Sequence, residues 1–586
     1  MKLNTFLKAK QILLFTVALT FFGCTKLDEV VIDEVLGENA SSPAGALAAA
    51  YDRLGKGTFV DHGAVFALQE YTTDEAVLPT RGSDWGDGGK WRSMHEFTWA
   101  ADNAIVTDNW NMLTNGITRS LTAIREVSNS SDPQKALYLA EAKGLLAYYT
   151  YTTLDLFGQA PFRDPMNDRA PLQIKQAATA IDELITEVEG LVPNLATLGT
   201  QNTHNGRFTK EAAYGLLANM YLNRAVYKDR YAASFNFNEK SVNSNETDMD
   251  RVIYYTSLLI GSPKFRLNSN YFDNFAIKNE GGSELIWVVT QKIDKIRNGS
   301  NSFAYVCVER NQRPSPGTRG TNAACITPEF YDTWDGNHDD PRFSRKYQYN
   351  DGTWFTNDAP GSVPATDFIT GSTTQLWFHF NRGIMIGQQY GPKLTSTGAY
   401  EMTSDGRIKV SELVMEKSTT TKMNFTRELN FDNPAQAVFA QNQINRGARV
   451  FKFEYDPGDG NGASNVDIPL FRLGVIYTLR AEAYFRKGQT ALAVADINLL
   501  RTSRTREAYH NNAPGVAIST LDEAKLYKEI AFETYWEMYR RPQMIRFGKY
   551  EQAFSAKPVS QPTRRIFPIP QTTLDVSKDF VQNKGY

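Results

Sequence analysis

Apolar residues recur at helical spacing in several parts of the chain. Between Asp132 and Gly158, apolar or small residues occupy positions 137, 140, 144, 147, 151 and 154, at intervals of three and four. This spacing predicts a helix that starts with Asp132 as its cap and Pro133 at its first position, and that ends at Gly158. Gly144 and Ala147 on the apolar face would let a second helix approach closely. Further helices are expected at about 177–191, 209–227, 248–260, 470–486, 490–504 and 520–540.

Pairs of these helices predict a mainly α fold with tetratricopeptide-like helical hairpins, although the chain has no clean repeat of about 34 residues. Thr520 and Glu523 form a capping-box pattern at the start of the last helix. Two long regions, 61–115 and about 293–465, are rich in Gly, Asn, Asp, Thr and Pro and are expected to be irregular. A few short strands are also expected, one of them a buried strand around Trp287. The fold class is therefore helical, with a large loop-rich region.

The N-terminal residues have the pattern of a secretory signal. Basic residues precede an eleven-residue, mostly apolar run from Ile12 to Phe22, and Gly23-Cys24 follows. Signal peptides have apolar regions of roughly 7–15 residues, whereas a spanning helix needs ~20. Residues around Cys24 resemble a bacterial lipobox, so residues 1–23 are expected to be a signal peptide and Cys24 a lipidation site. Acyl chains there would hold the protein on a membrane, with residues 24–60 as the lipidated N-terminus and tether.

Composition narrows the class of protein further. The net charge is −2, and loss of the three lysines in residues 1–23 makes it more negative, so no basic excess suggests nucleic acid. A chain of 586 residues exceeds the size of a single core, and two interleaved or sequential units are expected. After Cys24 the remaining cysteines are Cys307 and Cys325, which could form a disulfide or remain buried thiols; the residues favour neither.

Several segments in order resemble signature motifs of the SusD/RagB family. They span most of the chain after Cys24: Glu141–Tyr151, Leu156–Phe162, Gly206–Leu222, Pro469–Ala483, Asp496–Arg501, Tyr535–Gly548, Phe567–Pro570 and Gln582–Tyr586. The acidic residues after Cys24, Asp28 and Glu29, resemble the export signal of lipoproteins on the outer surface of Bacteroidetes-type bacteria; a plain acidic tether is the alternative. These motifs are mainly scaffold positions, so they say little about the ligand.

The resemblance implies a SusD-like fold with an N-terminal region at 61–280 and a RagB/SusD C-terminal region at 281–586. It implies a lipid-anchored outer-membrane protein, facing the cell surface, that captures nutrient for a SusC-like TonB-dependent outer-membrane barrel. No enzymatic activity and no cofactor come with the resemblance. Family ligands are usually glycans, so an oligosaccharide is the expected ligand; RagB-type members take peptides, which is the alternative.

An exposed aromatic platform beside planar polar side chains would suit a glycan, because sugar rings have flat C–H faces and rims of hydroxyls. The glycine-rich loop from Thr80 to Trp91 combines these groups, and the primary candidates are Arg81, Asp84, Trp85 and Trp91. Glycan-binding members of the family also draw aromatics from loops after the strand that here contains Trp287. That resemblance adds Phe303, Tyr305 and Arg310, with Trp377 behind them. The alternative is that Trp85 and Trp91 pack the loop onto the scaffold.

A surface glycosidase is the third hypothesis, because carboxylates are plentiful. Sequence spacing cannot place two of them across one sugar bond, and solvated turns explain them more simply. The run from Asp335 to Asp340 imitates the start of a calcium loop but lacks its glycine and final glutamate. The stretch from Asp456 to Asp467 could wrap a cation, with a surface turn as the simpler interpretation. No metalloprotease, serine-hydrolase or nucleotide-binding motif is present in the sequence, so no metal site is predicted.

Overall fold

The computed structural model describes residues 42–586 except 83, 168, 295–301, 430–443 and 461, so the predicted signal peptide and Cys24 lie outside the described residues. The helices are α2 (Pro43–Arg53), α3 (Val65–Glu70), α4 (Lys90–Glu96), α5 (Ala104–Ser128), α6 (Lys135–Phe157), α7 (Ala177–Leu191), α8 (Lys210–Lys228), α9 (Asp248–Ile260), α10 (Ser302–Tyr305), α11 (Pro328–Thr333), α12 (Leu473–Arg486), α13 (Thr490–Ser503), α14 (Glu523–Thr534), α15 (Arg540–Arg546) and α16 (Gln571–Val576).

The strands are short. They are β1 (Ala76–Val77), β2 (Gln159–Phe162), β3 (Gln173–Gln176), β4 (Leu285–Val289), β5 (Cys325–Ile326), β6 (Ser344–Arg345), β7 (Gly361–Val363), β8 (Arg382–Met385), β9 (Gly387–Gln388), β10 (Tyr390–Pro392), β11 (Ile408–Glu412), β12 (Val414–Met415), β13 (Ser418–Lys422), β14 (Asn424–Phe425), β15 (Arg449–Phe451) and β16 (Ile468–Arg472). Their pairings are antiparallel, in small sheets of two or three strands such as β10-β11-β7 and β15-β8-β6.

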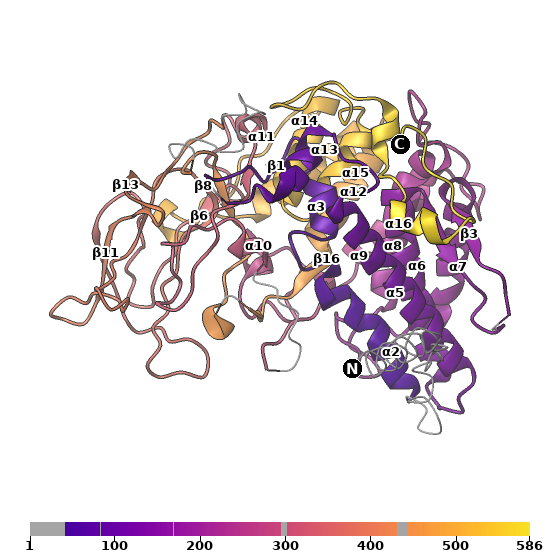
Figure 1. Ribbon diagram of the computed structural model, residues 1–586, viewed down its shortest axis with the longest axis horizontal. Coiled ribbons are helices and arrows are strands. Elements are labelled where there is room, and N and C mark those ends of the chain that lie inside the picture. The colour runs from indigo at the N-terminus through magenta and orange to yellow at the C-terminus, as the bar shows by residue number, and fades with distance from the viewer. Residues whose placement is uncertain (1–41, 83, 168, 295–301, 430–443, 461) are drawn as a thin grey trace, which may run out of the picture.

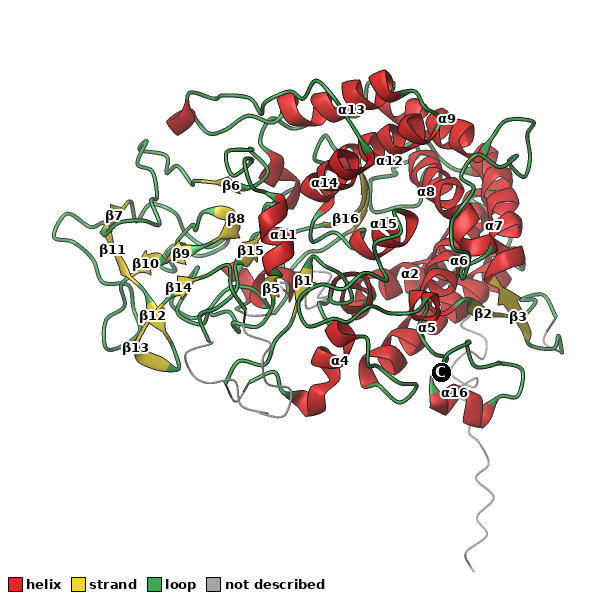
Figure 2. Cartoon of the chain, turned by 90° about the horizontal axis from the view of Figure 1, so that it is seen from above, coloured by secondary structure: helices red, strands yellow, loops and turns green. Residues whose placement is uncertain are grey.

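Helical hairpins form one side of the molecule and a loop-and-strand lobe the other, as Figures 1 and 2 show. Helices α5 and α6 pack along each other, α8 and α9 follow, and α12 and α13 join them. All six positions of the predicted apolar face of α6 are buried. A Cβ added at Gly144 would lie 2.2 Å from Cδ1 of Phe208, just before α8. The predicted helical fold and the close approach at Gly144 are therefore confirmed.

Several predicted boundaries hold and others do not. Helices α7 and α9 have the predicted bounds, but α6 begins at Lys135 because Asp132 and Pro133 form a turn, in which Asp132 accepts a hydrogen bond from the amide of Gln134 at 2.7 Å. The prediction that 61–115 is irregular was wrong in three places, because α3 and α4 lie inside this region and α5 begins in it. Helix α5 begins inside it, where the side chain of Asn103 caps the amide of Ile105 at 2.9 Å.

The prediction of a single helix at 520–540 was wrong, because α14 ends at Thr534 and α15 begins at Arg540. Its N-cap is Asp522, whose side chain accepts from Lys525 N, so the predicted capping box does not form. The helix then breaks between α14 and α15, where Trp536 and Met538 have φ of 64° and 67°, in the left-handed region. Two buried carboxyls accept hydrogen bonds from the backbone amides of this break. Glu75 accepts from Trp536 N at 2.6 Å, and Glu70 accepts from Met538 N at 2.5 Å. These contacts stabilise a turn that a helix would exclude.

The loop-and-strand lobe, residues 302–429 and 444–472, has its own hydrophobic cluster. Phe355, Phe378, Phe380 and Phe425 are among its buried members. This cluster explains how a region with few regular elements keeps a defined shape. Trp287 is fully buried in β4, as predicted, while Cys307 and Cys325 are buried free thiols.

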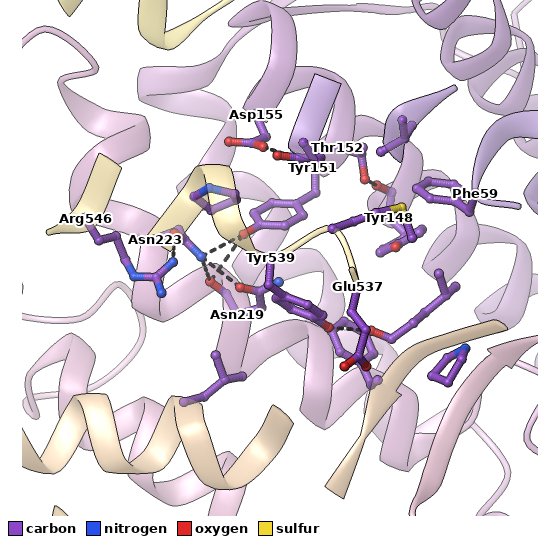
Figure 3. A pocket seen from close by; sticks show the side chains of 18 residues that line it. Phe59, Tyr148, Tyr151, Thr152, Asp155, Asn219, Asn223, Glu537, Tyr539 and Arg546 are labelled. Carbon is purple, nitrogen blue, oxygen red and sulfur yellow. Dashed lines mark hydrogen bonds between the residues drawn. The ribbon is translucent and has the colours of Figure 1, made fainter. Parts of the chain in front are cut away.

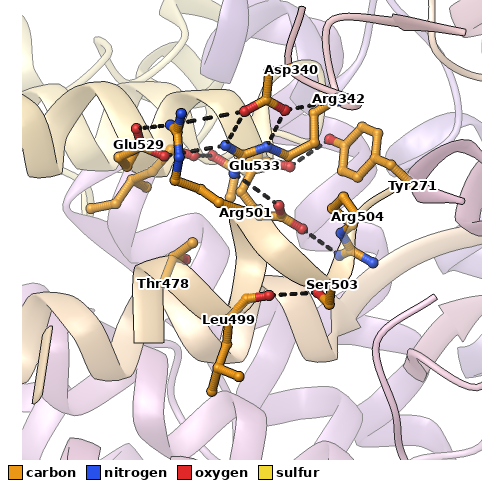
Figure 4. Close-up of polar contacts among 12 residues, drawn as sticks. Tyr271, Asp340, Arg342, Thr478, Leu499, Arg501, Ser503, Arg504, Glu529 and Glu533 are labelled. Atoms are coloured by element: carbon orange, nitrogen blue, oxygen red, sulfur yellow. Dashed lines mark hydrogen bonds and ion pairs between the residues drawn. The ribbon is translucent and has the colours of Figure 1, made fainter. Parts of the chain in front are cut away.

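A buried ion-pair network joins the lobe to the helices (Figure 4). Glu533 on α14 binds Arg472 at 2.7 Å, Arg504 at 2.8 Å and Arg342 at 3.3 Å, and these four side chains are fully buried. Glu284, just before β4, also pairs with Arg472 and Arg504. The main hydrophobic cluster likewise contains residues from both predicted regions. Within the described residues, no helix is both long and apolar enough to cross a bilayer.

Candidate functional site

The segment that leads from Arg81 into α4, where Trp91 lies, has a strained backbone at Trp85 and Asp87. Arg81 and Asp84 exchange backbone hydrogen bonds of 2.9 and 3.0 Å, which close a tight turn. The next residue, Trp85, has φ of 61°, and Asp87 has φ of 38°. A bulky side chain rarely adopts this left-handed conformation, so surrounding contacts must hold it there.

An aromatic cluster supports this tryptophan. The ring of His62 lies 5.5 Å from Trp85, edge to face, and stacks on Trp91 at 5.3 Å. Trp85 and Trp91 contact each other at 5.9 Å, and Trp91 Nε1 donates to Asp87 at 2.7 Å. Burial lowers the pKa of His62, which keeps the ring uncharged at neutral pH. Trp91 is only 6% exposed, whereas Trp85 is half-buried, so Trp91 forms the base and Trp85 carries the accessible surface.

A row of charged side chains lies beside Trp85. Asp84 pairs with Arg310 at 2.9 Å and with Lys417 at 2.6 Å. Arg310 also lies 3.7 Å from Glu416, which in turn lies 3.6 Å from Arg319. We call these five residues the charged row. Burial disfavours ionisation of Asp84, but hydrogen bonds from Lys417 and Arg310 outweigh it and lower its pKa. The row thus presents ionised groups, which are strong hydrogen-bond partners for hydroxyls.

Glu309 fixes the backbone at Glu416 of the row and at Asn311, the residue after Arg310. Its carboxylate accepts hydrogen bonds from the backbone amides of Asn311 at 2.5 Å and Glu416 at 3.0 Å. The side chain of Asn311 donates to Val414 O at 2.9 Å. These contacts connect the segment after α10 to the turn between β12 and β13. The structure therefore brings together Asp84, Trp85 and Arg310, which the sequence predicts from two distant segments.

Two of the predicted ligand-binding residues, Arg81 and Phe303, lie in the interior of the protein. Arg81 is buried, and its guanidinium donates to Ala323 O, Arg446 O and Cys325 Sγ, so it cannot orient ligand hydroxyls in this conformation. Phe303 is 2% exposed and packs between Phe66 and Phe453, which removes it from the surface as well.

Tyr305, at the end of α10, is half-buried against the core of the lobe and keeps part of its surface accessible. Trp377 is also half-buried and contacts His379 at 4.1 Å between ring centroids. Sequence reasoning missed His62, Arg319, Glu416 and Lys417. No local motif marks these residues, because only the tertiary fold brings them beside Trp85.

Two cavities elsewhere lack the predicted residues. Figure 3 shows the first, a space of about 70 Å³ between α6, α8 and α15. Hydrogen bonds such as Arg546 to Asn223 at 2.9 Å cross its wall, and it is smaller than the roughly 300–1,000 Å³ of ligand pockets. The second, about 840 Å³, lies beside α2 and includes Tyr51, Tyr138 and Arg207. Neither contains an aromatic platform from the predicted loops.

Comparison with known proteins identifies the family. A model of the SusD family matches residues 236–586. The chain belongs to the SusD family. It is 25% identical over 556 residues to the starch-binding protein SusD of Bacteroides thetaiotaomicron, covering 89% of this chain and 85% of that protein. The SusD family resemblance drawn from the motifs is thereby confirmed.

Solved SusD-like structures share the fold. A laminarin binding SusD-like protein aligns with a TM-score of 0.61 at 18% identity, covering 94% of this chain and all of that one. Surface glycan-binding protein A from Bacteroides thetaiotaomicron, in complex with laminarihexaose, aligns with a TM-score of 0.58 at 16% identity, covering 92% and 98%. These SusD family likenesses establish the architecture over nearly the whole chain.

Proposed function

We propose that this protein is a lipid-anchored glycan-binding protein of the outer membrane that captures an oligosaccharide at Trp85 and delivers it to a SusC-like TonB-dependent barrel. The observation that carries the proposal is the half-buried Trp85 beside the charged row of Asp84, Arg310, Arg319, Glu416 and Lys417. An aromatic face can stack on a sugar ring while charged groups bind its hydroxyls. The named starch-binding and laminarin-binding relatives support a glycan as the ligand class.

The anchor and the transporter partner come from the sequence pattern and the family resemblance. Cys24 would carry the lipid, and the barrel would receive the ligand at the cell surface. The division into regions 61–280 and 281–586 also stays a prediction. Peptide capture, as in RagB-type members, is the alternative outcome of the ligand test, because the family resemblance permits it.

Binding without hydrolysis fits the chemistry of the site. A glycosidase needs one carboxyl group that remains protonated to act as a general acid. The pKa of Asp84 is lowered, and its two basic partners keep it ionised. Glu416 lies between Arg310 and Arg319, so both carboxylates of the charged row are engaged in ion pairs. Burial raises the pKa of Glu309, but this side chain is only 2% exposed and accepts two backbone amides. We therefore propose a binding role and no catalytic one.

The test is glycan binding by the mature chain, with Cys24 omitted, and by its Trp85→Ala variant. A glycan array and a peptide array identify the ligand class, and calorimetry then measures affinity. Loss of an aromatic anchor should weaken binding at least about tenfold. Trp354→Ala is the matched control, because Trp354 is also half-buried but packs against Tyr509, outside the charged row. Unchanged glycan affinity in Trp85→Ala would refute the site, and peptide-only binding would replace the proposed ligand class.

A further inference from the structure

A separate cleft of about 540 Å³ lies in the loop-and-strand lobe. Four segments form its walls: 315–318, 374–376, 399–402 and 457–460. Its volume falls within the roughly 300–1,000 Å³ that ligand-binding pockets occupy. None of the residues predicted to bind the glycan lines it. We call it the lobe cleft.

The lobe cleft combines apolar and polar surface. Leu376, Tyr400 and Met402 line it together with Thr374 and Asp459. Such a lining suits a ligand whose faces are apolar and whose edges carry hydroxyls. An oligosaccharide has this character in each of its units.

An exposed aromatic ring stands beside the lobe cleft. Phe368 is 43% exposed and forms an antiparallel bridge with Leu376. Residues directly opposite in such a pair point to the same face, so Phe368 lies on the side that Leu376 contributes to the cleft. An exposed phenylalanine next to a mixed cleft offers a second surface for stacking on a sugar ring.

Glycines leave open space in two of the four segments that line the cleft. An added Cβ at Gly317 or Gly460 would meet no heavy atom within 4 Å. The segment 457–460 is fixed by Asp456, whose carboxylate accepts hydrogen bonds from the backbone amides of Gly458 at 2.9 Å and Asn465 at 2.8 Å. The cleft is therefore open to a ligand and has a defined backbone on that side.

The lobe cleft adjoins the charged row. Thr318 of its wall precedes Arg319, which pairs with Glu416 and through it with Arg310 and Asp84. The hydroxyl of Tyr455 donates to Arg319 O at 3.2 Å, which links the 319 loop to the segment that leads into 457–460. A chain of ion pairs thus runs from Asp84, next to Trp85, to Arg319 at the edge of the cleft.

We propose that the lobe cleft binds the part of an oligosaccharide that extends beyond Trp85 along the charged row. The proposal rests on the proposed function and adds that the protein selects long chains over short ones. A disaccharide at Trp85 would leave the lobe cleft empty, whereas a chain of six or seven sugars would use both surfaces. Binding along a second surface contributes affinity only when one ligand can reach both.

The test is to place a large side chain in the cleft. In Gly317→Trp the new side chain enters open space, so the fold should persist, and circular dichroism checks it. Gly361→Trp is the matched control, since Gly361 also has open space around it and lies in the same lobe outside the cleft. Calorimetry compares laminarihexaose with laminaribiose and maltoheptaose with maltose. We expect Gly317→Trp to weaken binding of the longer chain about tenfold and to leave its disaccharide unchanged.

The outcomes separate the two proposals. Equal affinity of Gly317→Trp and the Gly361→Trp control for the longer chains would overturn the role of the lobe cleft. An equal loss for long and short chains would also overturn it, because the substitution would then act on the Trp85 surface. If Gly317→Trp does not fold, Phe368→Ala should show the same length-dependent loss. Failure of the unaltered protein to bind any of the four sugars would contradict the proposed function itself for these glycan classes.

Discussion

Replacing Glu533 with glutamine should strongly destabilise the protein. The carboxylate is fully buried and binds Arg342, Arg472 and Arg504 at 3.3, 2.7 and 2.8 Å. Burial disfavours its ionisation, but the three arginines outweigh this and lower its pKa from 4.5 to about 2. Each pKa unit corresponds to about 1.36 kcal/mol, so the ionised group stabilises the folded state by roughly 3 kcal/mol near neutral pH. Loss of one partner from a buried pair costs a similar ~3–5 kcal/mol.

The assay is urea unfolding at neutral pH, followed by tryptophan fluorescence, for the unaltered protein and for Glu533→Gln. Glu412→Gln is the matched control, because Glu412 pairs with Lys422 at 3.0 Å on the surface, where the side chains are 37% and 65% exposed. An exposed pair contributes only about 0–1 kcal/mol. A loss in Glu533→Gln no larger than that of the control would refute the reasoning.

The pH dependence of the same group has a definite sign. Because the folded pKa of Glu533 is below its ordinary value, the unfolded chain binds more protons between pH 4.5 and about 2. The stabilisation is therefore fully present above pH 4.5 and declines as the pH falls toward 2. Glu533→Gln should lack this part of the acid sensitivity, and the difference between the two unfolding curves at several pH values measures it.

Two further predictions concern packing and a buried acid pair. Gly144→Ala should cost about 1–3 kcal/mol in thermal unfolding, because the added Cβ would lie 2.2 Å from Phe208, whereas Gly190→Ala, in a helix with nothing within 4 Å, should not destabilise. If Gly144→Ala destabilises the protein no more than Gly190→Ala does, the close packing at Gly144 would be contradicted. Burial raises the pKa of Glu75 and of its neighbour Glu70, so stability should decrease as the pH rises above 4.5, and Glu75→Gln should reduce that decrease. Identical pH profiles of thermal unfolding for Glu75→Gln and the unaltered protein would contradict the raised pKa values of this buried pair.

Much of the helical half could be predicted from sequence because helix formation depends on near neighbours. The spacing of apolar residues along α6 and the bounds of α7 and α9 follow from contacts three and four residues apart. The break after α14 could not be predicted in this way. It depends on Glu75, which accepts the amide of Trp536 from 461 residues away in the sequence. A local pattern contains no signal for such a contact.

The candidate site also has features that the sequence predicts and features that depend on the tertiary structure. From the sequence alone, Asp84, Trp85 and Trp91 could be predicted to share one glycine-rich segment, and the motifs indicated the family that the family model confirms. Only the tertiary structure decided that Trp91 supports the loop and Trp85 keeps an accessible face, and that Arg310 lies against Asp84. Residue type sets which interactions a side chain can make, but burial and partners depend on segments far apart in the chain, which meet only when the core forms.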